Sequence, residues 1–226
     1  MAIRDQLDQI HQRIDGAAKQ YGRPHQSVKL LAVSKTKPAT MVHKAYDAGQ
    51  RDFGENYLQD ALEKIDALPL DDIVWHFIGA IQSNKTKTIA ENFDWVHGVD
   101  RLKIARRLGE QRPSAKEPIN ICIQVNSSGE ESKSGVLFSE LPSLAKEIGK
   151  LPGIRLRGLM TLPAPSSSLN EQRVPFRQLH DAMVQLNEDG LSLDTLSMGM
   201  SGDMEAAIAE GATIVRIGTD IFGARQ

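Results

Sequence analysis

Short apolar runs alternate with longer segments of helical periodicity along the whole chain. The apolar runs predict strands at residues 28–34, 52–54, 73–78, 94–98, 119–125, 156–160, 195–197 and 213–217. Between them, the spacing of apolar positions predicts helices at residues 39–48, 57–68, 84–91, 101–111, 137–149, 171–187 and 204–210. Strands that alternate with helices in this order indicate βαβ units and a parallel sheet.

The number of strands favours a closed barrel. Eight βα units in a chain of 226 residues predict a single-domain (β/α)8 TIM barrel over residues 1–226, with an open doubly wound sheet as the alternative. Residues 218–226, after the last predicted strand, are too few for a full outer helix. Ile3, Leu7, Ile10 and Ile14 have helical spacing, so an extra N-terminal helix could fill that gap.

Composition narrows the class of protein further. The hydrophobic content of 40% and charged content of 25% are typical of a soluble globular protein. A net charge of -2 provides no field to hold nucleic acid, and no apolar run approaches the length of a membrane span. Asp5 and Asp8 argue against a targeting segment, and the single Cys122 excludes an intramolecular disulfide. We therefore expect a cytoplasmic monomer without membrane or nucleic-acid partners.

Reactive and polar residues follow several predicted strands. In a parallel barrel, functional groups gather at the C-terminal strand ends, and phosphate groups commonly bind the loops after strands seven and eight. The first strand ends at Lys35, and the segment GEN places Asn56 after the second. Ser201, predicted as the N-cap of the helix at 204–210, follows strand seven, and Gly218 and Thr219 follow strand eight. Together these loops predict a phosphate site.

Arg216 interrupts the apolar strand ATIVRIG and shares its face with Gly218, two residues on. A guanidinium there is costly unless its donors are satisfied, so one interpretation is an internal ion pair with a carboxylate such as Glu55. The other is a ring-nitrogen donor, because an amine at Lys35, a phosphate site and such a donor are what pyridoxal 5'-phosphate (PLP) requires. A Schiff-base aldolase would use the same lysine and phosphate site but has no ring nitrogen to satisfy.

Other signals are weaker. His76 is interpreted as an acid/base group, a ring-stacking neighbour of the cofactor, or a core histidine. Lys37 could tune the charge of Lys35, although we expect Pro38 to break the strand register there. Lys133 in SSGEESKSG is expected to face water rather than overhang the site. No His, Cys and carboxylate residues have metal-ligand spacing, and neither GxGxxG nor a nucleophile elbow is present.

Several long segments resemble one family. In chain order they are AVSKTKP, FGENY, WHFIGAIQSNK, ESKSG, RGLMTLPAP, LSMGMSGDMEAAI and VRIGTDIFGAR, which closely resemble the pyridoxal phosphate homeostasis proteins of the YggS/PROSC family. The resemblance implies a barrel similar to the alanine racemase N-terminal domain, with PLP bound as a Schiff base on Lys35. It also implies Asn56 near the cofactor ring, Arg216 facing the pyridine nitrogen, and the phosphate held by Ser201, Gly218 and Thr219.

The function implied by this resemblance is the binding and supply of PLP, with effects on amino-acid and keto-acid balance and possible transfer to apoenzymes. Arg216 would donate a hydrogen bond without protonating the ring, and a neutral ring is a poor electron sink. We therefore expect no robust enzymatic turnover. The alternatives are a weak PLP-dependent amino-acid racemase that uses Lys35, an aldolase, and a barrel that serves only as a protein-interaction module.

Overall fold

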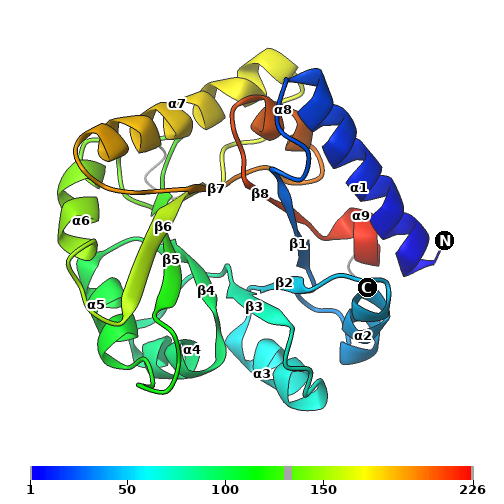
Figure 1. Ribbon diagram of the computed structural model, residues 1–226, viewed down its shortest axis with the longest axis horizontal. Helices are drawn as coiled ribbons and strands as arrows, with labels where there is room; N and C mark the ends of the chain where they lie inside the picture. Colours follow the sequence, from blue (N-terminus) through cyan, green and yellow to red (C-terminus); the bar gives the residue numbers. More distant parts are fainter. Residues whose placement is uncertain (1, 130–133, 225–226) are drawn as a thin grey trace.

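Eight parallel strands close into a barrel in chain order (Figure 1). The computed structural model describes residues 2–129 and 134–224, so Lys133 lies outside the described residues. The first strand, β1, pairs with both the second and the eighth strand, which excludes the open sheet. The predicted TIM barrel is therefore confirmed. The strands are β1 (Lys29–Val33), β2 (Asp52–Glu55), β3 (Val74–Phe77), β4 (Trp95–Val99), β5 (Ile119–Val125), β6 (Ile154–Thr161), β7 (Thr195–Ser197) and β8 (Ile214–Ile217).

Helices surround the barrel on its outer side (Figure 1). They are α1 (Ile3–Gln20), α2 (Ala39–Asp47), α3 (Leu58–Ala67), the 3-10 turn η1 (Ser83–Lys85), α4 (Thr86–Asn92), α5 (Leu102–Glu110), α6 (Leu141–Ile148), α7 (Leu169–Glu188), α8 (Met204–Ala209) and α9 (Thr219–Phe222). The helix predicted at 137–149 begins only at Leu141, because the backbone N–H of Leu137 donates to the Glu140 carboxylate and forms a turn first.

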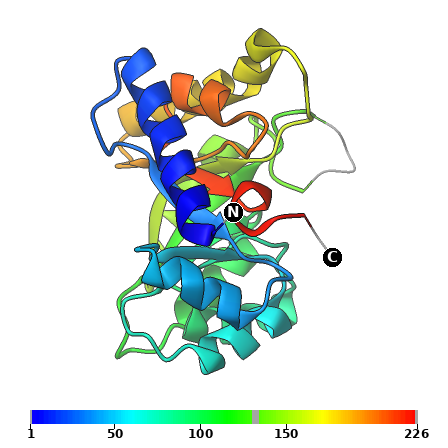
Figure 2. The same cartoon turned by 90° about the vertical axis from the view of Figure 1, so that its right-hand side faces the viewer.

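The N-terminal helix occupies the place of an eighth outer helix. Its apolar face, which includes Leu7, Ile10 and Ile14, is buried. The helix contacts α8, α9 and α2, and in Figure 2 it crosses in front of the barrel between α8 and α2. After β8 the chain forms only the four-residue α9. The predicted use of the N-terminal helix to fill this gap is confirmed.

Alternate strand residues face the inside of the barrel and the helix layer. Residues in register on neighbouring strands point to the same side of the sheet. Arg216 is in register with Leu31, and His76 is in register with Gly54 and Trp95. The outward positions are mostly large apolar side chains such as Phe53, which is fully buried against the helices. The inward positions lead toward the C-terminal strand ends, where the candidate site lies.

The described residues contain neither a membrane-spanning helix nor a cluster of metal ligands. No helix among residues 2–129 and 134–224 combines the length and apolar character that crossing a membrane requires. Over the same ranges, no group of three or more His, Cys, Asp or Glu side chains is arranged to hold a metal ion.

Candidate functional site

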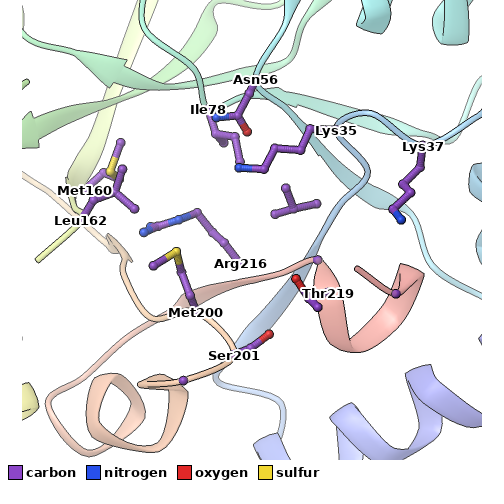
Figure 3. Close-up of a pocket in the computed structure, with 14 residues that line it drawn as sticks. Lys35, Lys37, Asn56, Ile78, Met160, Leu162, Met200, Ser201, Arg216 and Thr219 are labelled. Carbon is purple, nitrogen blue, oxygen red and sulfur yellow. The ribbon is translucent and has the colours of Figure 1, made fainter. Parts of the chain in front are cut away.

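A pocket of about 300 Å³ lies at the C-terminal ends of the strands. The structure brings together in its lining six residues that the sequence analysis assigned to the cofactor: Lys35, Asn56, Ser201, Arg216, Gly218 and Thr219 (Figure 3). Apolar side chains complete the wall, namely Val33, Ile78, Met160, Leu162 and Met200. The pocket therefore combines one polar group at each of several strand ends with an apolar surface that suits a flat ring.

A tight turn after β1 aims the two lysines differently. Thr36 has a φ of 62°, in the left-handed region that a β-branched residue rarely adopts. Its N–H donates to the Asp60 carboxylate at 3.0 Å. The strand register therefore breaks at Thr36 and not at Pro38. Figure 3 shows Lys35 reaching into the pocket beside Asn56, whereas Lys37 lies at the margin and donates to the Ala224 carbonyl at 2.7 Å.

A buried lysine in the helix layer stabilises this turn. Lys64 in α3 is only 3% exposed, and its Nζ donates to the Ser34 carbonyl at 2.8 Å, to Glu55 Oε1 at 2.7 Å and to Asp60 Oδ2 at 2.9 Å. Burial raises the pKa of Glu55, and the Lys64 ammonium opposes that rise. The Lys64 ammonium group thus holds the backbone on both sides of Lys35: it contacts the Ser34 carbonyl directly and reaches the Thr36 N–H through the Asp60 carboxylate.

Sequence reasoning missed Lys64. The available signal was a lysine four residues after Asp60, next to the helix face that buries Ala61. Because Glu55 points outward to Lys64, the alternative ion pair between Glu55 and Arg216 is excluded.

Arg216 lies inside the barrel and is 4% exposed. Its Nη1 donates to Ser197 Oγ at 2.8 Å and its Nη2 to the Thr161 carbonyl at 2.9 Å. Within the described ranges it forms no ion pair with a carboxylate. Burial lowers its pKa to about 10, which leaves the guanidinium protonated at neutral pH. As predicted, Arg216 and Gly218 share a face, because both line the pocket.

The two loops predicted to hold phosphate meet at one side of the pocket. Ser201 follows β7 and Thr219 follows β8, and Figure 3 shows both hydroxyls on that side. Space is open there, since an added Cβ at Gly202 would meet no atom within 4 Å. The predicted N-cap role of Ser201 is wrong: Asp203 is the N-cap of α8, and its carboxylate accepts the Met200 N–H at 2.6 Å.

Asn56 carries an unsatisfied polar atom at the pocket wall. Its Oδ1 is buried and has no hydrogen-bond donor among the described residues. Its position depends on Gly79, where a Cβ would lie 2.1 Å from the Asn56 carbonyl oxygen. A buried amide oxygen without a donor is costly in a folded protein, so this atom suits a ligand group that donates a hydrogen bond.

His76 lies inside the barrel, and the structure does not bring it to the pocket lining. Its ring is fully buried, stacks on Trp95 with centroids 5.5 Å apart, and bonds His97 at 2.9 Å and Asp52 at 3.0 Å. Of the three interpretations offered for His76, the geometry matches the core histidine. Sequence reasoning did not single out His97, whose signal was its place two residues after Trp95 on the same strand face.

Comparison with known proteins assigns the barrel to a class. The model of the family described as "Alanine racemase, N-terminal domain" matches residues 6–226. A pyridoxal phosphate homeostasis protein of Pseudomonas aeruginosa is 56% identical over 99% of this chain and 96% of its own length. Another, from Escherichia coli, is 51% identical over 99% of this chain and 97% of its own. The chain belongs to the pyridoxal phosphate homeostasis protein family.

A solved relative agrees with this assignment. The structure of PipY from Synechococcus elongatus with PLP bound has a TM-score of 0.84 and 35% identity to this chain. The match covers 98% of this chain and 100% of PipY.

Proposed function

We propose that this protein binds PLP as a Schiff base on Lys35 and serves intracellular PLP homeostasis by buffering or delivering the cofactor. One observation carries the proposal: Lys35, Arg216, Ser201 and Thr219, from the ends of β1, β7 and β8, line a single pocket. Bound PLP supplies an aldehyde that forms a reversible imine with an amine. The names of the relatives and the PLP-bound PipY structure support the same ligand.

Each pocket residue matches a different part of PLP by its chemistry. The Lys35 amine is the nucleophile for the aldehyde, and the Ser201 and Thr219 hydroxyls donate to a phosphate. The Oδ1 atom of Asn56, which has no partner among the described residues, would accept a hydrogen bond from a donor at the edge of the ring. The apolar wall covers the ring faces. Each polar group therefore has a matching partner on PLP, and the unsatisfied amide of Asn56 gains one.

The Lys35 assignment is tested by the absorbance of the purified protein. We expect a yellow protein whose visible band shifts on borohydride reduction and is absent in Lys35→Ala. Lys37→Ala, which changes the lysine at the pocket margin, is the matched control and should keep the band. A protein that stays colourless when PLP is added would overturn the cofactor assignment, together with the racemase alternative.

Arg216 carries the argument against robust turnover. A guanidinium with a pKa of about 10 donates a hydrogen bond to the ring nitrogen and keeps its own proton at neutral pH. The ring then stays neutral and stabilises carbanions poorly. Arg216→Glu should protonate the ring nitrogen and change the spectrum of the bound cofactor. An unchanged spectrum in a folded variant would mean that Arg216 does not face that nitrogen.

The alternative is a weak racemase, which needs an acid/base group on each face of the substrate. Among the described residues that line the pocket, Lys35 and Lys37 are the basic amines, and neither histidine nor tyrosine contributes. Lys37 lies at the pocket margin and donates to the Ala224 carbonyl, so this arrangement favours binding over turnover. Incubation with single L-amino acids followed by chiral chromatography tests it, and D-isomer at ordinary enzymatic rates would refute the homeostasis proposal.

Delivery to apoenzymes is the finer part of the proposal. Transfer of bound PLP to a PLP-requiring apoenzyme should be faster than spontaneous release into buffer. Equal rates would reduce the role to buffering. The predicted monomeric state and cytoplasmic location are checked by light scattering and by fractionation of cells.

A further inference from the structure

A continuous chain of hydrogen bonds crosses the barrel interior and ends at Arg216. Asp52 Oδ1 lies 3.0 Å from His76 Nε2, and His76 Nδ1 lies 2.9 Å from His97 Nε2. His97 Nδ1 lies 2.7 Å from Ser197 Oγ, which accepts from Arg216 Nη1 at 2.8 Å. The two histidines and Ser197 are fully buried. The chain thus connects the N-terminal end of β2 with the pocket at the opposite end of the barrel.

The two charged ends fix the direction of every bond. Asp52 is a carboxylate that also accepts from Lys29, so His76 must donate from Nε2. A neutral His76 then has only an acceptor at Nδ1, which requires His97 to donate from Nε2. His97 Nδ1 is in turn an acceptor, so Ser197 must donate its hydroxyl proton to it. The one role left to Ser197 toward Arg216 is that of an acceptor.

The surroundings of the two rings keep them neutral. Burial lowers the pKa of both histidines, and for His97 the nearby His76 and the Arg216 guanidinium add to the effect. Around His76 the charged groups are Asp52, which opposes the shift, Lys29 and Asp94. A second positive charge at His97 would therefore lie in the interior close to Arg216 without a carboxylate of its own.

We propose that Ser197 and His97 are positioning residues that orient Arg216 toward the ligand in the pocket. Ser197 holds Nη1 and the Thr161 carbonyl holds Nη2, so the plane of the guanidinium is fixed and its remaining N–H groups are directed away from these anchors. Because the Ser197 proton is committed to His97, Ser197 cannot turn to donate elsewhere. This inference rests on the proposed function, in which the ligand presents a ring nitrogen to Arg216.

The direction of the chain is tested on cofactor-free protein. In ¹⁵N spectra of histidine-labelled protein at pH 7, we expect His76 and His97 as neutral Nε2–H tautomers. Asp52→Asn offers both a donor and an acceptor at the chain end, so a population of Nδ1–H tautomers should appear. An Nδ1–H tautomer or a doubly protonated ring at either position in the native protein would overturn the proposal, whether or not PLP binds.

The effect on the ligand is tested with Ser197→Ala and His97→Leu. We expect the dissociation constant for PLP to rise by roughly ten- to a hundredfold, and the spectrum of bound PLP to shift in the same direction in both variants. Ser197→Thr keeps the hydroxyl and should restore the native spectrum. The matched control is Thr86→Val, which removes another buried hydroxyl with hydrogen bonds to Ser83 and Gln111, outside the barrel.

The outcomes separate this inference from the proposed function. If the native protein forms the Lys35-dependent band, and Ser197→Ala binds PLP with native affinity and spectrum, the positioning role is refuted. If the native protein forms no such band, the proposed function fails. The tautomer experiment alone then tests the direction of the hydrogen bonds between Asp52 and Arg216. If Ser197→Ala does not fold, His97→Leu tests the positioning role by a second route, because it keeps the contact between Arg216 and Ser197 but removes the acceptor that holds the Ser197 hydroxyl proton.

Discussion

Acidification below about pH 6.5 should destabilise this protein through two buried histidines. Burial lowers the pKa of His76 and, to a greater extent, of His97. In the unfolded chain both titrate near the ordinary pKa of about 6.5. A group whose folded pKa is lowered contributes stability above the unfolded value, and this contribution is lost as the pH falls toward the folded pKa. The window therefore opens near pH 6.5 and extends downward.

The magnitude follows from proton counting. Where the unfolded chain binds one proton more than the folded protein, the free energy of unfolding changes by about 1.36 kcal/mol per pH unit. One histidine that stays neutral when folded thus loses about 1.4 kcal/mol between pH 7.5 and 5.5. Two would lose at most about 2.7 kcal/mol. His97 should account for the larger share, because the Asp52 carboxylate partly restores the pKa of His76.

Urea unfolding of cofactor-free protein at pH 7.5 and 5.5 measures this difference. His97→Asn should be less stable at both pH values but should lose at least half of the pH dependence. Glu55, whose pKa burial raises, acts in the opposite sense, and its contribution cancels in the comparison of variant with native protein. His25→Gln, at a side chain that is 73% exposed, is the control and should leave the dependence intact. Equal pH dependence in native protein and His97→Asn would refute the reasoning.

Three further predictions concern stability alone. Lys64→Met leaves the Glu55 carboxylate buried without its partner and should cost about 3–5 kcal/mol in urea unfolding; the double variant with Glu55→Gln should recover part of this loss. Gly158→Ala would place a Cβ 1.8 Å from the Thr195 carbonyl oxygen and should separate β6 from β7, with a large drop in melting temperature. Gly16→Ala in α1, where a Cβ meets nothing within 4 Å, should instead raise stability by up to about 1 kcal/mol.

The fold was predictable because its signals are local. Several strands are short, largely apolar runs bounded by turn residues, and the strand observed at Ile119–Val125 matches the prediction. The predicted start of a helix was wrong where two residues with the same local preference compete. Ser201 and Asp203 are both good N-cap residues; Asp203 takes the N-cap position of α8, and its carboxylate accepts the Met200 N–H rather than an N–H of the helix. Nothing in the separate residues distinguishes the two.

The positions of the pocket residues were predictable from barrel geometry, but their supports were not. Lys35, Arg216 and Thr219 stand at strand ends, and the topology alone brings those ends together. The supports depend on distant partners: Lys64 contacts Ser34, thirty residues earlier, and His97 contacts Ser197, one hundred residues later. A buried lysine or histidine looks like any other until its partner is known.

The inward strand positions nevertheless carry a readable pattern once the barrel is accepted. Barrel interiors are ordinarily filled by layers of branched apolar side chains, yet here Asp52, His76, His97, Ser197 and Arg216 all point inward and bond one another. Polar groups buried in this way are tolerated only when each finds a partner, so one polar residue on an inward position requires others beside it. Because an arginine can only donate and a carboxylate can only accept, such a row must start at one and end at the other. The polar interior is therefore a directed structure, and it ends at the residue that faces the pocket.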